Sequence, residues 1–499
     1  MIYIYILKIY LHNDFSYKIV ANSSSIDLPL YYKIFAPFAT HEGSLFILFF
    51  IYILISYFFT YKIQKQIVKQ EIFAFKIIAS FNLLCIILFS IVIYQVDIFA
   101  KNTNSIENFG LNVLLQDYAL LIHPPILYIS YTLIIISSIF VFIGIFIFNC
   151  NNNQNIIENN LEQNNNNNNN SSSIESNKQD NKDKTNNNII LNNNIKLNHR
   201  ENLVENNFEL SEFLKRILNF IRTAWILNIL AIALGSNWGY REFNWGGYWS
   251  YDPIEILSLI IFIILTGFYH VLLIAIKNQR LIKLSFLFAI SSFFAIIFAF
   301  CISRAGILVS SHAFAINKIN FVIFFYLFTL FLISFVFGIF KIKEINQSST
   351  HKTNGIKIFA FVILLQIIVL LIAILMPIFY KAIFNLSINI DQDFFTYIFN
   401  PLIIPILILM SFFVKDKKIY HILKYISPIP IILVILNYYN NFDYLSIIYL
   451  FLCYLCIVIS IIFMKQKISG MLISHIAFVL LIISIIFNKT LEKEFLLKV

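Results

Sequence analysis

The sequence predicts an all-α, polytopic integral membrane protein with about twelve transmembrane helices and a tryptophan-rich loop on its outer face. Of its 499 residues, 59% are hydrophobic and only 12% are charged. Soluble domains carry about 25% charged residues, so this composition excludes a soluble globular enzyme. The mean hydropathy of +0.78 agrees with burial in a bilayer.

The predicted spans are apolar stretches close to the length of about 20 residues that a helix needs to cross the hydrocarbon core. They lie at Ser44–Tyr61, Phe73–Val96, Ala119–Phe148, Leu214–Leu234, Ile254–Ile276, Leu281–Cys301, Phe321–Phe340, Ile356–Phe379, Tyr397–Val414, His421–Leu436, Tyr444–Phe463 and Met471–Phe487. Accordingly, we divide the chain into an outer-face N-terminal segment (1–43), three helices (44–148), an inner loop (149–210), a core with the tryptophan-rich loop 235–253 (211–345), and C-terminal helices (346–499).

The inner loop 149–210 is dominated by asparagine and lacks apolar periodicity. It cannot offset the entropy of ordering by burying apolar surface, so we expect it to be disordered.

Lysine and arginine set the orientation of the spans. They gather in alternate short loops, around residues 62–69, 277–283, 341–343, 415–418 and 465–467, while the intervening loops carry aspartates. The lysine-rich face is therefore the inner one. The net charge of +10 is a topology signal, and no nucleic-acid partner is expected.

Two histidines and an aromatic loop share the outer face in this topology. His123 lies at the outer end of the third span, and His312 follows the sixth. Between them, the loop 235–253 carries Trp238, Trp245, Trp249, Tyr248 and Tyr251. Imidazoles and aromatic faces suit a flat metallomacrocycle such as haem. Membrane-interface aromatic belts are the alternative explanation of this loop.

Two charged motifs flank this loop. Arg304 lies on the outer face against the positive-inside trend, where it can pair with a haem propionate, a lipid phosphate, Asp252 or Glu242. Asp252, followed by Pro253 and Glu255, is typical of a helix start: an N-cap, a proline at the first position and a capping box.

Two further histidines lie within predicted spans. Counted along the helices, His270 in the fifth span is about 24 Å below the outer end, and His475 is near the inner end of the twelfth. Both reach similar depth, which suits a bis-histidine b-type haem, although a hydrogen bond to a neighbouring helix would explain either one alone. The role of His41, at the outer end of the first span, is left open.

These segments resemble a known family. Trp245-Gly-Gly-Tyr-Trp-Ser-Tyr-Asp-Pro-Ile-Glu255 is similar to the "WWD" signature of haem-handling proteins, and within them the chain resembles the CcmF-type subunit of system I cytochrome c maturation. Further matching segments are Phe15–Asn22, His41–Ser44, Leu114–Asp117, His123–Pro125 and Ser303–His312. The resemblance is strong over residues 15–315 outside the asparagine insertion, and weaker beyond, except at 470–475. Tyr248 and Tyr251 stand where the family usually has tryptophan.

The resemblance implies a cytochrome c haem lyase component. His123 and His312 would hold incoming haem, while His270 and His475 would ligate a resident haem b. The family joins haem vinyl groups to the thiols of a CxxCH motif in apocytochrome c after taking haem from a carrier protein. Other maturation subunits would be partners, and a separate chain could supply two N-terminal helices that the family usually has.

Alternatives to this function are a haem transporter or relay without ligation activity, and a membrane subunit of a respiratory complex. We expect the mitochondrial inner membrane, with the haem site facing the intermembrane space, because the amino-acid bias suggests an AT-rich coding sequence and no targeting peptide is visible. A bacterial inner membrane is the alternative location.

Overall fold

Every regular element that the structure describes is a helix, which confirms the predicted all-α class. The structure is a computed structural model. It describes residues 2–64, 99–102, 110–141, 144, 181–243, 248–277, 281–304, 308, 310, 329, 333, 336, 340, 354–386, 388, 390–412, 444–464 and 470–496. The chain divides into two units, Met1–Thr350 and His351–Val499, and each is described by itself.

Six helices within the described residues are long and apolar enough to cross a membrane: Ala119–Val141, Ser211–Glu242, Pro253–Ala275, Ile282–Ser303, Asn354–Phe384 and Gln392–Met410. The bent pair Leu30–Ala39 and Glu42–Phe58 would make a seventh. The protein is therefore a multi-pass membrane protein. The predicted spans Phe73–Val96 and His421–Leu436, and most of Phe321–Phe340, lie outside the described residues.

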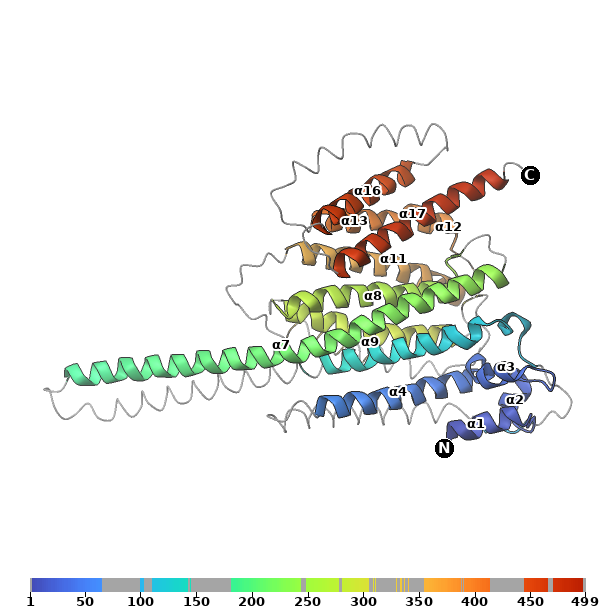
Figure 1. The fold of residues 1–499 in the computed structure, drawn as a ribbon, viewed down its shortest axis with the longest axis horizontal. Helices are drawn as coiled ribbons and strands as arrows, with labels where there is room; N and C mark the ends of the chain where they lie inside the picture. Colours follow the sequence, from blue (N-terminus) through green and yellow to red (C-terminus); the bar gives the residue numbers. More distant parts are fainter. Residues whose placement is uncertain are drawn as a thin grey trace. The chain divides into compact units, whose positions relative to one another are not determined.

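Four helices form the centre of the first unit. They are Ala119–Val141, α7 (Asn181–Glu242), α8 (Pro253–Ala275) and α9 (Ile282–Arg304), and α8 packs against both α7 and α9 (Figure 1). The Ala119–Val141 helix contacts α7, because the Ser130 hydroxyl donates to the Ala224 carbonyl at 2.9 Å. Ala224 and Ala231 are fully buried on that face of α7, and such small side chains let two helices approach closely.

Helix α7 extends beyond both ends of the predicted span Leu214–Leu234. It begins at Asn181, inside the segment 149–210 for which the sequence predicts disorder, while residues 151–180 lie outside the described part of the chain. It ends at Glu242, so Trp238 lies on a helix rather than in a loop. Extending a formed helix gains one hydrogen bond per residue, and contacts of Arg241 described below hold this end.

The N-terminal segment folds as short helices around a buried tyrosine. These are α1 (Ile2–Leu11), α2 (Lys18–Ser23), α3 (Leu30–Phe35) and the 3₁₀ turn η1 (Ala36–Ala39). The Tyr10 hydroxyl donates to the Ile19 carbonyl at 3.0 Å and lies 2.7 Å from Ser23 Oγ. Tyr10 and the apolar side chains around it thereby join α1 to α2.

Helix α4 (His41–Gln64) starts at a sharp bend after η1. The backbone N–H of Gly43 donates to Thr40 Oγ1 at 3.1 Å, and that hydroxyl donates to the Pro37 carbonyl at 3.0 Å. The two segments that meet here are bent by 91°. The segment His41–Ser44 is thus the first turn of a helix capped by Thr40.

Replacing Gly43 by alanine is expected to destabilise this bend. A Cβ at Gly43 would clash with the Pro37 carbonyl and lie only 2.6 Å from Thr40 Oγ1. Overpacking of this kind costs about 1–3 kcal/mol, which thermal unfolding of the purified protein in detergent would detect. Gly470→Ala is the matched control, because nothing lies within 4 Å of a Cβ there. Equal unfolding temperatures for the two variants would contradict this account.

The second unit is also helical. Its elements are α11 (Asn354–Phe384), α12 (Gln392–Phe394), the π turn η4 (Phe395–Phe399), the 3₁₀ turn η5 (Asn400–Leu402), α13 (Ile403–Phe412), α16 (Tyr444–Met464) and α17 (Gly470–Leu496). Cys453 and Cys456 are buried on α16, and Cys456 Sγ lies 3.4 Å from the Leu407 carbonyl. The two cysteines therefore serve as small packing side chains.

Candidate functional site

A cavity of about 240 Å³ lies in the first unit, among the Ala119–Val141 helix, α7, α8 and α9. His123, Trp238 and Trp249, three of the residues predicted to bind haem, line it together. Tyr128, Tyr131 and Phe300 add further aromatic rings to the wall. The structure thus brings together one histidine and an aromatic surface from four segments distant in sequence.

The ring of His123 is oriented by helix α7. Its Nδ1 lies 2.8 Å from the Ala231 carbonyl oxygen. A carbonyl can only accept, so Nδ1 carries the proton and the neutral ring has its lone pair on Nε2. Histidines that ligate metals are commonly fixed in this way, by a hydrogen bond from the other ring nitrogen.

Trp238 and Trp249 are each fixed by a different set of neighbours. The Trp238 Nε1–H donates to the Leu114 carbonyl at 3.0 Å, and its ring makes an edge contact with Phe243, with centroids 5.1 Å apart. Trp249 meets Tyr251 edge to face at 6.0 Å. Both indoles are thus fixed by neighbours while they line the cavity.

Tyr248 and Tyr251, which the sequence predicts to contact haem, are not among the residues that line the cavity. Tyr248 stacks on Tyr240 with centroids 4.4 Å apart and is 49% exposed. Tyr251 has a positive φ of 57°, a left-handed conformation that is uncommon for a bulky side chain. This turn directs the chain from Trp249 into the start of α8.

The predicted capping box at the start of α8 is confirmed. Asp252 Oδ1 accepts from the Ile254 N–H at 3.0 Å, and Glu255 Oε2 accepts from the Asp252 N–H at 3.2 Å. Ser310 Oγ donates to Asp252 Oδ1 at 2.7 Å, so Ser310 lies beside the start of α8. Asp252 therefore organises the rim of the site, while the buried Glu255 lines the cavity.

A cluster that the sequence analysis missed holds the end of α7. Arg241 Nη2 pairs with Asp117 Oδ1 at 2.6 Å, and its guanidinium also contacts Asn237 and lies over the Tyr118 ring at 4.2 Å. Asp117 Oδ1 also accepts from the Ala119 N–H at 2.7 Å, so the same carboxylate caps the next helix. We call Arg241, Asp117, Asn237 and Tyr118 the Arg241 clamp. In the sequence, the available signal was the presence of two opposite charges in loops predicted for the outer face of a chain with few charges.

His270 lies on α8, where its Nδ1 is 2.8 Å from the Thr266 carbonyl of the same helix. The same argument places the lone pair of the neutral ring on Nε2. The Thr266 hydroxyl accepts from Trp225 Nε1–H at 2.9 Å, which links this turn of α8 to α7. His475 belongs to α17 in the second unit, so its pairing with His270 stays a prediction.

Several predicted residues lie outside the described part of the chain. Trp245 and His312 are not described, and the side chains of Arg304 and His41 are not described either. Their predicted roles are not tested by the structure.

The residues around the cavity fit haem by their chemistry. A histidine whose neutral ring has its lone pair on Nε2, together with several aromatic rings, could hold a haem group. The volume is below the range of about 300–1,000 Å³ for typical ligand pockets. The described residues would therefore enclose only part of such a macrocycle.

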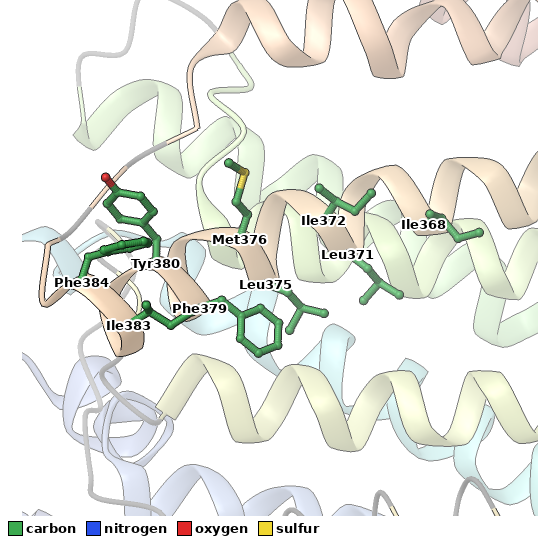
Figure 2. Close-up of a pocket in the computed structure, with 9 residues that line it drawn as sticks. All are labelled: Ile368, Leu371, Ile372, Leu375, Met376, Phe379, Tyr380, Ile383 and Phe384. Carbon is green, nitrogen blue, oxygen red and sulfur yellow. The ribbon is translucent and has the colours of Figure 1, made fainter.

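A groove of about 490 Å³ runs along α11 in the second unit (Figure 2). All of its lining side chains come from this one helix, and they include Met376, Phe379 and Tyr380. None of those lining residues is a histidine or carries a charge. The groove thus lacks the imidazole that distinguishes the cavity at His123.

Apolar spans around a histidine–tryptophan cavity define a polytopic helical membrane protein with a cavity lined by aromatic side chains. The chain belongs to the cytochrome C assembly protein family, whose model matches residues 38–309. This membership confirms the predicted resemblance.

The chain is similar to bacterial cytochrome c-type biogenesis proteins. It is 23% identical over 416 residues to CcmF of Escherichia coli, covering 82% of this chain and 55% of that protein. It is 23% identical over 414 residues to NrfE of Haemophilus influenzae, covering 81% and 55%. The chain spans about half the length of these curated relatives.

A solved structure of "Cytochrome c Heme Lyase CcmF" shares the fold. The TM-score is 0.64 with 14% sequence identity, and the match covers 98% of this chain and 68% of that one. The arrangement of helices is therefore CcmF-like.

Proposed function

We propose that this protein handles haem in cytochrome c maturation, holding it at the outer-face cavity while it is joined to apocytochrome c. The observation that carries the proposal is His123, whose tautomer is fixed by the Ala231 carbonyl in a cavity lined by Trp238 and Trp249. Family membership supports the same conclusion.

Each residue would have its own role in haem binding. His123 and His312 would ligate the haem iron, and the cavity-lining Trp238 and Trp249 would pack against the ring. Arg304 would pair with a propionate. Asp252 would act through its capping of α8, which positions Trp249 and Tyr251.

Haem is the substrate in this proposal. Each thioether forms when a CxxCH thiol adds across a haem vinyl group: the sulfur bonds to one vinyl carbon and the thiol hydrogen goes to the other. The addition itself consumes neither oxidant nor reductant. The chain's own contribution would be to orient the ring and expose its vinyl edge to the apocytochrome.

A resident haem b between His270 and His475 is a second part of the proposal. We also propose about twelve spans, more than the six or seven candidate spans among the described residues. The other proposed partners are a haem carrier, further maturation subunits and a chain that supplies N-terminal helices. We propose the mitochondrial inner membrane, with the cavity facing the intermembrane space, from the amino-acid bias of the chain. The bacterial relatives favour the bacterial inner membrane as the alternative.

A haem titration of the full chain in detergent tests the outer-face site. His123→Ala is expected to weaken haem binding at least tenfold, because an axial ligand is lost. His12→Ala is the matched control, since His12 is exposed on the N-terminal segment, with Nδ1 2.8 Å from the Lys8 carbonyl. Wild-type affinity in His123→Ala would overturn the proposed site.

Capture of a CxxCH peptide separates a lyase component from a relay. The wild-type protein loaded with haem is expected to retain the peptide, and a peptide with both cysteines replaced by serine should not be retained. Haem binding without any peptide complex would favour the relay.

A further inference from the structure

Gly235 lies directly against the ring of His123. A Cβ at Gly235 would come within 2.9 Å of His123 Cε1, 3.3 Å of Nδ1 and 3.5 Å of Nε2. The first distance is shorter than carbon atoms tolerate without a shift. The His123 ring can pack in this position against α7 only because residue 235 has no side chain.

The position of this glycine follows from helix geometry. Cα–Cβ bonds in a helix tilt toward its N-terminus, so a side chain lies over the turn that precedes it. Gly235 is one turn after Ala231, the residue whose carbonyl accepts from His123 Nδ1 at 2.8 Å. A helical carbonyl has a second lone pair beyond its intrahelical bond. With glycine at 235, an imidazole from another helix can reach that lone pair.

His123 and His270 differ in this respect. His270 bonds the Thr266 carbonyl of its own helix, four residues earlier, so its ring orientation is set locally. His123 bonds a carbonyl of a different helix, so its orientation depends on how closely α7 lets the ring approach.

We infer that Gly235 is a positioning residue for His123: by leaving the Ala231 carbonyl open, it fixes the ring as the Nδ1–H tautomer with Nε2 as the ligating atom. The consequence for haem rests on the proposed function. The orientation of the ring does not, and it can be measured without haem.

The first test reads the tautomer directly. Full-length protein labelled with ¹⁵N-histidine is compared by NMR in haem-free detergent micelles, and the His123 signals are assigned by their loss in His123→Gln. The wild type is expected to show the Nδ1–H tautomer. Gly235→Ala should displace the ring, break the bond and give the Nε2–H tautomer or a mixture. Leu230→Ala, on the exposed side of α7, is the control and should leave the signal unchanged.

Folding does not confound this test, because the wild-type spectrum is itself decisive. An Nε2–H tautomer for His123 in the wild type overturns the inference without any variant. Alanine is also a better helix former than glycine, so α7 should persist in Gly235→Ala, as circular dichroism would verify. An unchanged Nδ1–H tautomer in the folded variant overturns the inference as well.

The second test measures haem affinity in the same variants. Loss of the hydrogen bond that orients a metal ligand typically lowers affinity 10–100-fold, so Gly235→Ala should bind haem at least about tenfold more weakly than the wild type. If wild-type protein binds no haem but the tautomer changes, the proposed function fails and the positioning role stands. If the tautomer changes and haem affinity does not, the role of Gly235 toward haem is overturned.

Discussion

Arg241→Leu is expected to lower the free energy of unfolding by about 2–3 kcal/mol. The substitution removes the cation that pairs with Asp117, whose side chain is only 10% exposed, and leaves that carboxylate without its counter-charge. Breaking a fully buried pair costs about 3–5 kcal/mol. The value here is smaller because Arg241 is 28% exposed. Unfolding in mixed sodium dodecyl sulfate and dodecyl maltoside micelles measures the change.

A second salt bridge on α7 provides the control. Lys215 pairs with Glu212 at 2.6 Å, but the two side chains are 53% and 39% exposed. Exposed pairs three residues apart contribute about 0.2–1 kcal/mol, so Lys215→Leu should change stability by less than about 1 kcal/mol. Similar losses in Arg241→Leu and Lys215→Leu would contradict the Arg241 clamp.

A double-mutant cycle separates the ion pair from the helix cap. Asp117→Leu removes both the partner of Arg241 and the oxygen that accepts from the Ala119 N–H, so it should cost more than Arg241→Leu. The double variant should be more stable than the sum of the two losses predicts, because the shared ion pair is lost only once. Strict additivity would show that the two residues do not interact.

The Arg241 clamp is also connected to the cavity. Arg241 and Trp238 both tie the end of α7 to the segment 114–118, through Asp117 and the Leu114 carbonyl. This segment leads directly into the helix that carries His123. Loss of the clamp should therefore weaken haem binding as well as stability, while Lys215→Leu should leave haem binding unchanged.

Structural features that depend on a few neighbouring residues could be predicted from the sequence. The start of α8 follows from Asp252, Pro253 and Glu255, since a cap, a helix-starting proline and a capping box act within one turn. The apolar stretches likewise place the spans of α8 and α9 within two residues of their observed bounds. Charge in the loops assigns His123 and the tryptophans to one face, and three of these residues do share a cavity.

Contacts between helices were not predictable in the same way. The sequence predicts a loop from Gly235 onward, but α7 continues through it to Glu242. Its role depends on the register between two helices, which places the His123 ring against it. The pairing of Asp117 with Arg241 has the same origin, since 124 residues separate them in the chain. A single sequence contains the apolar pattern of each helix but not this register.

His270→Ala is expected to abolish the b-type absorption of the reduced protein, if that signal comes from a resident haem held by His270. His270 is about 25 Å beyond Pro253 along α8, within the apolar part of the helix. An ionisable side chain is energetically costly at that depth, and those that occur there usually have a function. Its Nδ1 bonds the Thr266 carbonyl, so the lone pair of the neutral ring is on Nε2, the atom that a haem-ligating histidine would use.

Absorption spectra of dithionite-reduced, purified protein measure this effect, with haem content quantified as the pyridine complex. His475→Ala should lose the same signal, because a bis-histidine haem needs both ligands, and His12→Ala should retain it. A full b-type signal in His270→Ala would remove His270 from the site. Loss in His270→Ala with retention in His475→Ala would keep the haem on α8 and assign its second ligand to another residue. Because His123→Ala acts on the cavity at His123, it should lower the affinity for added haem without removing the resident signal, so the two sites can be tested separately.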